Sequence, residues 1–89
     1  MYSQRDNVNN PIAAQYTTTD LGSAAALLAA GFALLKLDRE TKPGRAFFVF
    51  EDSPKLQAAL NNYWSGELMV DAKAYFESSK WLKSRIYNG

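Results

Sequence analysis

The sequence predicts an α+β fold in which a small antiparallel sheet packs against three helices. Two strand-length apolar runs, residues 32–39 and 45–51, are joined by a short loop with a Pro-Gly pair, which is typical of a β-hairpin. Ser53 and Asp71 each stand before an amphipathic segment, as the N-cap residue of a helix does. With one strand and one helix before the hairpin, the predicted order is β-α-β-β-α-α.

Length and composition indicate a single small domain. The chain has 89 residues, of which 47% are hydrophobic and 21% are charged, so it has enough apolar material for one packed core. We assign residues 12–89 to this domain. Residues 1–11 are polar, rich in asparagine and closed by a proline, and we expect them to form a flexible N-terminal arm.

The sequence contains no candidate membrane span or export signal. No apolar stretch approaches the roughly 20 residues that cross a bilayer, and the N-terminus lacks the apolar run of a signal peptide. The most apolar segment, residues 24–37, is interrupted by Gly31 and Lys36. We therefore expect a soluble protein of the cytoplasm that makes no membrane contact.

The first strand and the first helix are predicted from residue types. Residues 12–18 contain a tyrosine and a run of threonines, which favours a short strand. Residues 18–20 are all good N-cap types, and they directly precede the alanine-rich segment 21–30. Gly31 stands where a glycine commonly ends a helix. A helix with both ends marked is therefore expected here.

The hairpin strands carry large apolar side chains on both of their faces. Strict alternation places Leu35 and Leu37 on one face of the first strand and Leu34 and Lys36 on the other. The phenylalanines of the second strand also divide between the two faces. We therefore expect both faces of the sheet to be covered.

The segment after the hairpin has the marks of a helix at both ends. Ser53 is followed by a proline at the first helical position, where a missing N–H has no cost. Apolar side chains then recur at the helical spacing i, i+3, i+4 and i+7, namely Leu56, Ala59, Leu60 and Tyr63. Gly66 is expected to end this helix.

The last helix is predicted over residues 72–87, with Asp71 as its cap. At 100° per residue, four polar residues form one narrow solvent-facing stripe: Lys73, Glu77, Lys80 and Ser84. Apolar residues occupy most of the remaining circumference, namely Ala74, Tyr75, Phe76, Trp81, Leu82 and Ile86. We expect a largely buried helix.

The composition argues against most enzymatic chemistry. The chain has no cysteine and no histidine, which are the usual thiolate nucleophile, neutral-pH proton carrier and zinc ligands. Four carboxylates lie near the ends of the hairpin, at Asp38, Glu40, Glu51 and Asp52. We interpret them as solvated turn charges rather than as a Mg²⁺ or acid–base site. We therefore expect no enzyme activity, no cofactor and no metal.

Residues 42–53, KPGRAFFVFEDS, resemble the third strand of an RNA-recognition-motif domain, whose aromatic side chains stack on bases. However, Arg45 occupies a position at which that family carries a stacking ring. A capped helix also follows where that family needs a fourth strand. We interpret this stretch as a core strand of a different fold.

A second resemblance covers residues 16–87, most of the chain. It depends on an ordered series of short motifs: YTTTDL (16–21), LLAAGF (27–32), FFVF (47–50), NYWSGE (62–67), VD (70–71) and LKSRIY (82–87). In this series the chain resembles a family of small domains of unknown function found in bacteria and their phages. The resemblance implies a phage or mobile-element accessory protein in the cytoplasm of a bacterial host, and it assigns no activity to individual residues.

The C-terminal run interleaves cations with aromatic rings, a mixture that contacts phosphates and stacks on bases. From it we predict that Lys80, Lys83 and Arg85 contact phosphate and that Tyr87 stacks on a base. The alternative is that these cations only favour the negative end of the helix dipole. The formal net charge of +1 predicts weak and local electrostatic attraction.

We predict that Lys36 and Arg45, expected to be neighbours on the hairpin, extend the row of phosphate contacts made by the C-terminal run. The alternative is that they only protect a sheet edge from aggregation. The leading prediction is a non-enzymatic accessory protein that binds single-stranded or duplex nucleic acid. The alternative is a homo-oligomeric protein–protein interaction module, in which a homodimer closes one sheet face or docks Trp64.

Overall fold

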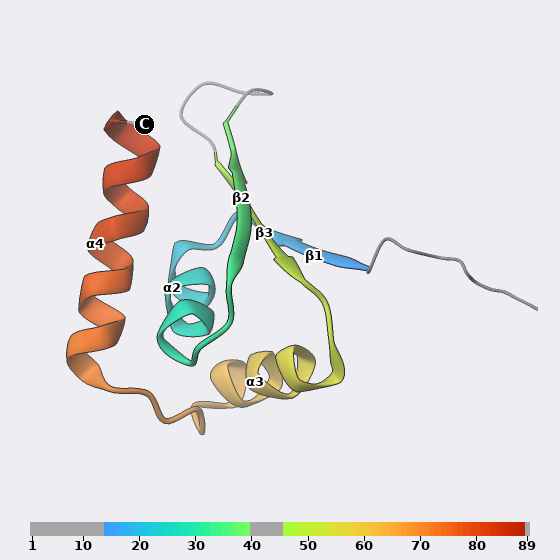
Figure 1. Ribbon diagram of the computed structural model, residues 1–89. Coiled ribbons are helices and arrows are strands. Elements are labelled where there is room, and N and C mark those ends of the chain that lie inside the picture. The colour runs from blue at the N-terminus through green and yellow to red at the C-terminus, as the bar shows by residue number, and fades with distance from the viewer. Residues whose placement is uncertain (1–13, 40–45, 89) are drawn as a thin grey trace, which may run out of the picture.

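The computed structural model describes residues 14–39 and 46–88, shown in colour in Figure 1. Six elements follow one another: β1 (Gln15–Thr18), α2 (Leu21–Ala29), β2 (Leu34–Asp38), β3 (Phe47–Glu51), α3 (Pro54–Ser65) and α4 (Ala72–Asn88). The predicted α+β class and the predicted order β-α-β-β-α-α are confirmed. The expected N-terminal arm and the Pro-Gly hairpin loop lie outside the described residues.

The three strands form one antiparallel sheet with the order β1-β3-β2. The central strand, β3, pairs with β1 over the register Gln15↔Glu51 to Thr18↔Phe48. It also pairs with β2, which confirms the predicted hairpin partners. The first strand is thus an edge strand, added to the side of β3 that the hairpin leaves open.

A β-bulge in β2 overturns the strict alternation expected for this strand. Leu34 pairs with Phe50, whereas Lys36 pairs with the adjacent Val49, so Leu35 is an extra residue in the ladder. One extra residue exchanges the two faces of the strand beyond it. As a result Leu34 and Leu37 both pack against the core, and Leu35 is exposed.

The helix ends follow the local sequence signals. Asp20, Ser53 and Asp71 each accept a hydrogen bond from the backbone N–H three residues further on, at 2.8, 3.0 and 2.9 Å. These bonds satisfy N–H groups that have no partner within the helix. Gly31 and Gly66 have positive φ angles of 103° and 82°, which explains why glycine follows each helix.

The core lies between the sheet and the helices. The small residues of α2, among them Ala24 and Ala25, lie against Phe48 and Phe50, which are fully buried. The helix α3 closes the lower end of this layer with Leu56 and Leu60 (Figure 1). Because alanine has a small side chain, α2 leaves room in the core for the two phenylalanines.

The other face of the sheet has no helix of the described residues over it (Figure 1). A shallow hollow on this face is lined only by strand residues, namely Gln15, Thr17, Lys36, Asp38, Phe47 and Val49. All three helices gather on the opposite side. The expectation that both faces would be covered is therefore not met within the described residues.

The last helix is much more exposed than its sequence predicts. In Figure 1, α4 stands at the edge of the domain and packs against α2. Leu82 is fully buried, but Phe76 and Trp81 are 61% and 47% exposed. The prediction of a largely buried helix is wrong, because α4 packs mainly on one side instead of being inserted between two layers.

Candidate functional site

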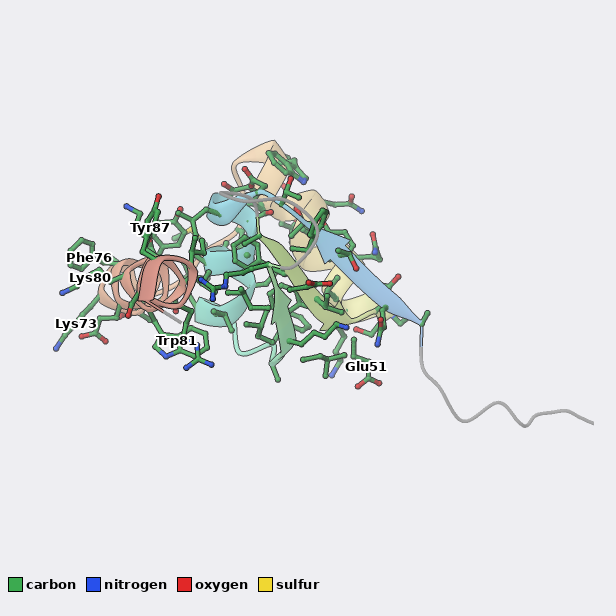
Figure 2. All side chains as sticks on the ribbon, turned by 90° about the horizontal axis from the view of Figure 1, so that it is seen from above. Glu51, Lys73, Phe76, Lys80, Trp81 and Tyr87 are labelled. Carbon is green, nitrogen blue, oxygen red and sulfur yellow. The ribbon has the colours of Figure 1, made fainter. Side chains whose placement is uncertain are left out.

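Five exposed side chains form a stripe along the outer side of α4. Their spacing of three, four, three and four residues keeps them on one side of a helix: Lys73, Phe76, Lys80, Lys83 and Tyr87. Figure 2 shows Lys73, Phe76 and Lys80 projecting from α4 away from the rest of the molecule. We call this set the outer stripe; at 1.5 Å per residue its Cα atoms span about 21 Å.

Cations lie next to aromatic rings along α4. The ammonium nitrogen of Lys80 lies 5.4 Å from the ring centroid of Phe76, and the guanidinium carbon of Arg85 lies 5.4 Å from that of Trp81. Both are cation–π distances. With Phe76 61% exposed and Tyr87 79% exposed, the helix presents flat apolar faces and positive charges together to solvent.

Charge is unevenly divided along the sequence. The helix α4 carries four cations and one anion, Glu77, a net charge of +3. The rest of the sequence carries six cations and eight anions, a net charge of −2. Lys73 lies 4.0 Å from Glu77, an exposed pair of little energetic weight. The formal charge of +1 therefore conceals a basic helix on a more acidic body.

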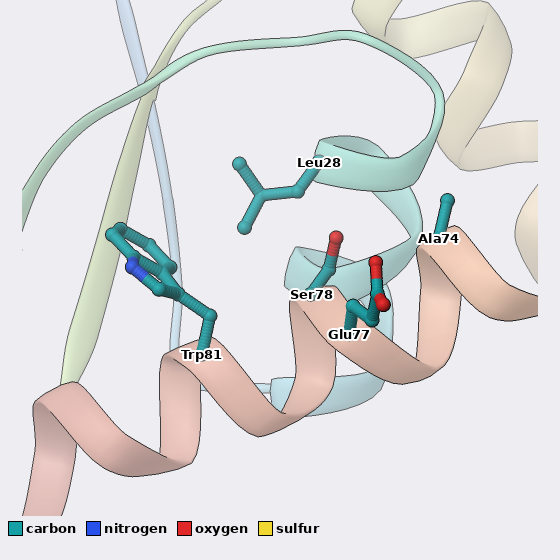
Figure 3. Close-up of a pocket in the computed structure, with 5 residues that line it drawn as sticks. All are labelled: Leu28, Ala74, Glu77, Ser78 and Trp81. Atoms are coloured by element: carbon teal, nitrogen blue, oxygen red, sulfur yellow. The ribbon is translucent and has the colours of Figure 1, made fainter.

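A hollow of about 510 Å³ lies beside α4 on the flank that carries Trp81 (Figure 3). The indole of Trp81 and the side chain of Leu28 form its apolar walls. Ala74, Glu77 and Ser78 complete the lining. The carboxylate of Glu77 makes this flank unfavourable for a phosphate group.

The structure brings together only part of the predicted set. Lys80, Lys83 and Tyr87 share the outer stripe, whereas Arg85 lies on the flank beside Trp81. Lys36 is on the sheet face opposite the helices, in the hollow that Asp38 also lines. Arg45 lies outside the described residues.

Trp64, the predicted interface residue, is 64% exposed near the end of α3. Its ring makes an edge-to-face contact with Tyr63, with the ring centroids 4.8 Å apart and the planes at 75°. The contact fixes one side of the indole and leaves most of it in solvent.

Two residues of this region were missed by sequence reasoning. Phe76 was placed in the buried arc, although its spacing of three and four residues from Lys73 and Lys80 is a signal for the outer stripe. Arg39 donates a hydrogen bond of 2.6 Å from Nη1 to the carbonyl oxygen of Ile86 near the end of α4. No local sequence pattern predicts this hydrogen bond between Arg39 and Ile86, because the two residues are 47 positions apart.

Within residues 14–39 and 46–88, no group of three or more histidine, cysteine, aspartate or glutamate residues is placed to hold a metal ion. Glu40, one of the four carboxylates considered above, lies outside these ranges. None of the helices in the described ranges has the length and apolar character needed to cross a bilayer.

Comparison with known proteins gives a family and no activity. No curated protein and no solved structure matches the chain. A family model described as a domain of unknown function, DUF5659, matches residues 13–88, which confirms the predicted resemblance to a small domain family of unknown function. The match covers β1 to α4, the whole of the fold described above. The chain therefore belongs to the DUF5659 family.

Proposed function

We propose that the outer stripe of α4 binds nucleic acid and that the protein is a non-enzymatic accessory protein. The observation that carries this proposal is the alternation of exposed lysines with the exposed rings of Phe76 and Tyr87 along one side of the helix. Lysines contact phosphates, and aromatic faces stack on bases of any sequence. A bacterial cytoplasm and a phage or mobile-element setting belong to the same proposal.

The distribution of charge supports binding of the nucleic acid at α4 rather than elsewhere on the protein. The residues outside α4 carry a net charge of −2 in the full sequence and repel a polyanion, whereas α4 attracts one with its net charge of +3. Lys73, Lys80 and Lys83 are the cations of the outer stripe. Three phosphate contacts give a slope of log affinity against log salt of about −2 for a single strand. A fourfold rise in salt should therefore weaken binding by roughly 15-fold.

The test is a titration of fluorescent single-stranded and duplex oligonucleotides, followed by anisotropy at low and moderate salt. The test variant is the double substitution Lys80→Gln and Lys83→Gln. The matched control, Lys55→Glu, lowers the net charge by the same two units at an exposed residue of α3. We expect the test variant to lose affinity and to show a slope near −0.7, and the control to resemble the wild type.

Two results would overturn the proposal. In the first, neither oligonucleotide binds the wild-type protein at low salt. In the second, the test variant and the control variant lose equal affinity, which would mean that binding follows net charge and is not localised on α4.

Self-association through Trp64 is the second candidate function, and the 64% exposure of this large apolar side chain favours it. Light scattering over a range of protein concentrations should then detect a dimer. Trp64→Ser should shift the protein to a monomer without changing its helix content. A wild-type protein that stays monomeric at high concentration would exclude this candidate.

A further inference from the structure

We propose that a hollow at the end of the outer stripe accepts one unstacked base, so that the protein binds single strands in preference to duplex. This inference rests on the proposed nucleic-acid-binding function and deepens it. The hollow has a volume of about 360 Å³. It lies between α4, the start of α2 and β3, and its lining comprises Thr19, Leu21, Ala46, Phe48, Lys83, Ile86 and Tyr87.

The lining has the composition that a base requires. Its apolar residues are Leu21, Ala46, Phe48 and Ile86. Of these, Ala46 and Phe48 are buried core residues, so they form a rigid floor of the hollow. The hydroxyl groups of Thr19 and Tyr87 offer hydrogen bonds, since both residues are exposed. The lining is mixed, with slightly more polar than apolar surface, so it offers hydrogen-bonding groups beside its apolar residues. Its volume is at the low end of the usual range for small-molecule pockets, which suits a single base.

The charged groups in its lining distinguish this hollow from other hollows on the surface. Three other hollows lined by described residues each include a carboxylate, from Glu77, Glu51 or Asp38. The hollow at the end of the outer stripe includes the ammonium group of Lys83 and no carboxylate of the described residues. It is therefore compatible with a base whose attached phosphate lies at the rim.

The hollow is continuous with the outer stripe, because Lys83 and Tyr87 belong to both. We expect the phosphates of a bound nucleic-acid strand to contact Lys73 and Lys80 in turn towards the C-terminal end of α4. The next nucleotide then lies with its base beside the hollow. A base in a duplex is stacked and paired, so it must be flipped out before it can enter a concave site. A base in a single strand enters without this cost.

The test compares three fluorescent probes at low salt: a single-stranded oligothymidine, an abasic strand with the same number of phosphates, and a blunt duplex. The abasic strand keeps the charge and lacks the bases. We expect the wild-type protein to bind the single strand about tenfold more tightly than the abasic strand, which is within the range that one stacked base contributes.

The variant Thr19→Phe places a ring in the hollow from an exposed position. It should bind the single strand less tightly than the wild type does and keep only the part of the preference that stacking on Phe76 contributes. Its affinity for the abasic strand should not change. Thr17→Phe makes the same substitution at an exposed residue on the opposite sheet face and is the matched control. Tyr87→Ala, at a side chain that is 79% exposed, leaves the core intact and should also reduce the preference. Because Tyr87 belongs to the outer stripe as well, Thr19→Phe is the variant that tests the hollow by itself.

The outcomes distinguish this inference from the proposed function. If the wild type binds the duplex as tightly as the single strand, or if a folded Thr19→Phe variant keeps the full preference for the single strand over the abasic strand, the base-binding hollow is wrong. The outer stripe would still stand in that case, provided that the double substitution of Lys80 and Lys83 weakens binding to both strands. If no probe binds, both proposals fail together.

Discussion

The hydroxyl oxygen of Tyr63 in α3 lies against the backbone of Gly22 in α2: a Cβ atom added to Gly22 would stand 2.5 Å from it. Real Cβ atoms almost never come this close to another heavy atom. The side chains of Asp20 and Tyr75 also approach this point, at 3.6 Å. The absence of a side chain at Gly22 therefore allows α2 and α3 to meet.

Gly22→Ala should destabilise the protein by about 1–2 kcal/mol, although alanine is the better helix former. The gain in helix propensity is at most about 1 kcal/mol. The added methyl group displaces the hydroxyl end of the half-buried Tyr63 side chain, and the neighbouring side chains of Asp20 and Tyr75 limit where it can move. Urea unfolding measures the difference. In a Tyr63→Phe background, which lacks the hydroxyl, Gly22→Ala should become neutral or stabilising. A stabilising effect of Gly22→Ala in the wild-type background would contradict the argument.

The stability of the protein should fall as the pH rises above 10, in part because of Tyr63. Burial raises the pKa of the Tyr63 phenol above its usual value of 10, and electrostatic interactions with Tyr75 and Asp20 act in the same direction. Above pH 10 the unfolded chain therefore loses this proton before the folded chain does, and the difference favours unfolding. Below pH 10 both states keep the proton, and the contribution is constant.

Urea unfolding at pH values from about 9 to 11 tests this assignment, since tyrosine normally titrates in that range. Tyr63→Phe removes the phenol, and the decline of stability with pH should become shallower than in the wild type. An unchanged decline would show that other groups are responsible.

Leu82→Ala should destabilise the protein by about 2–4 kcal/mol and expose α4. Leu82 is fully buried, and large-to-small substitutions at such positions leave a cavity. Trp81→Ala is the control: it removes a larger side chain from the neighbouring position, but that side chain is 47% exposed, so the loss should be smaller. Urea unfolding gives both values. A larger effect at Trp81 would mean that α4 is anchored by its flank and not by Leu82.

Arg39→Ala should loosen the end of α4 with little effect on the rest of the domain. It removes the hydrogen bond to the carbonyl oxygen of Ile86, which contributes about 1 kcal/mol or less at an exposed position. Hydrogen exchange should accelerate in the last turn of α4 and stay unchanged in α2. Arg39→Lys keeps a donor and should restore part of the protection. Equal exchange in all three proteins would mean that this contact does not hold the helix end.

The sequence alone determined the features that depend on neighbours along the chain. The caps at Ser53 and Asp71 are bonds between residues three positions apart, so residue type and position suffice to predict them. The pairing of β2 with β3 follows in the same way from two apolar runs and a short turn. For the candidate site, the sequence indicated Lys80, Lys83 and Tyr87, which share the outer side of α4.

The tertiary structure decided which of these faces are buried. Leu34 pairs with Phe50 and Leu37 pairs with Phe48, and both leucines pack on the core side, so Leu35 is left as the bulge residue. The sequence of β2 alone does not predict this arrangement. The apolar arc of a helix indicates which side chains can be buried, whereas the elements that pack against the helix determine which of them are buried. Because α4 packs mainly on α2, Phe76 remains in solvent, and the hollow beside Lys83 forms from residues separated by more than 60 positions.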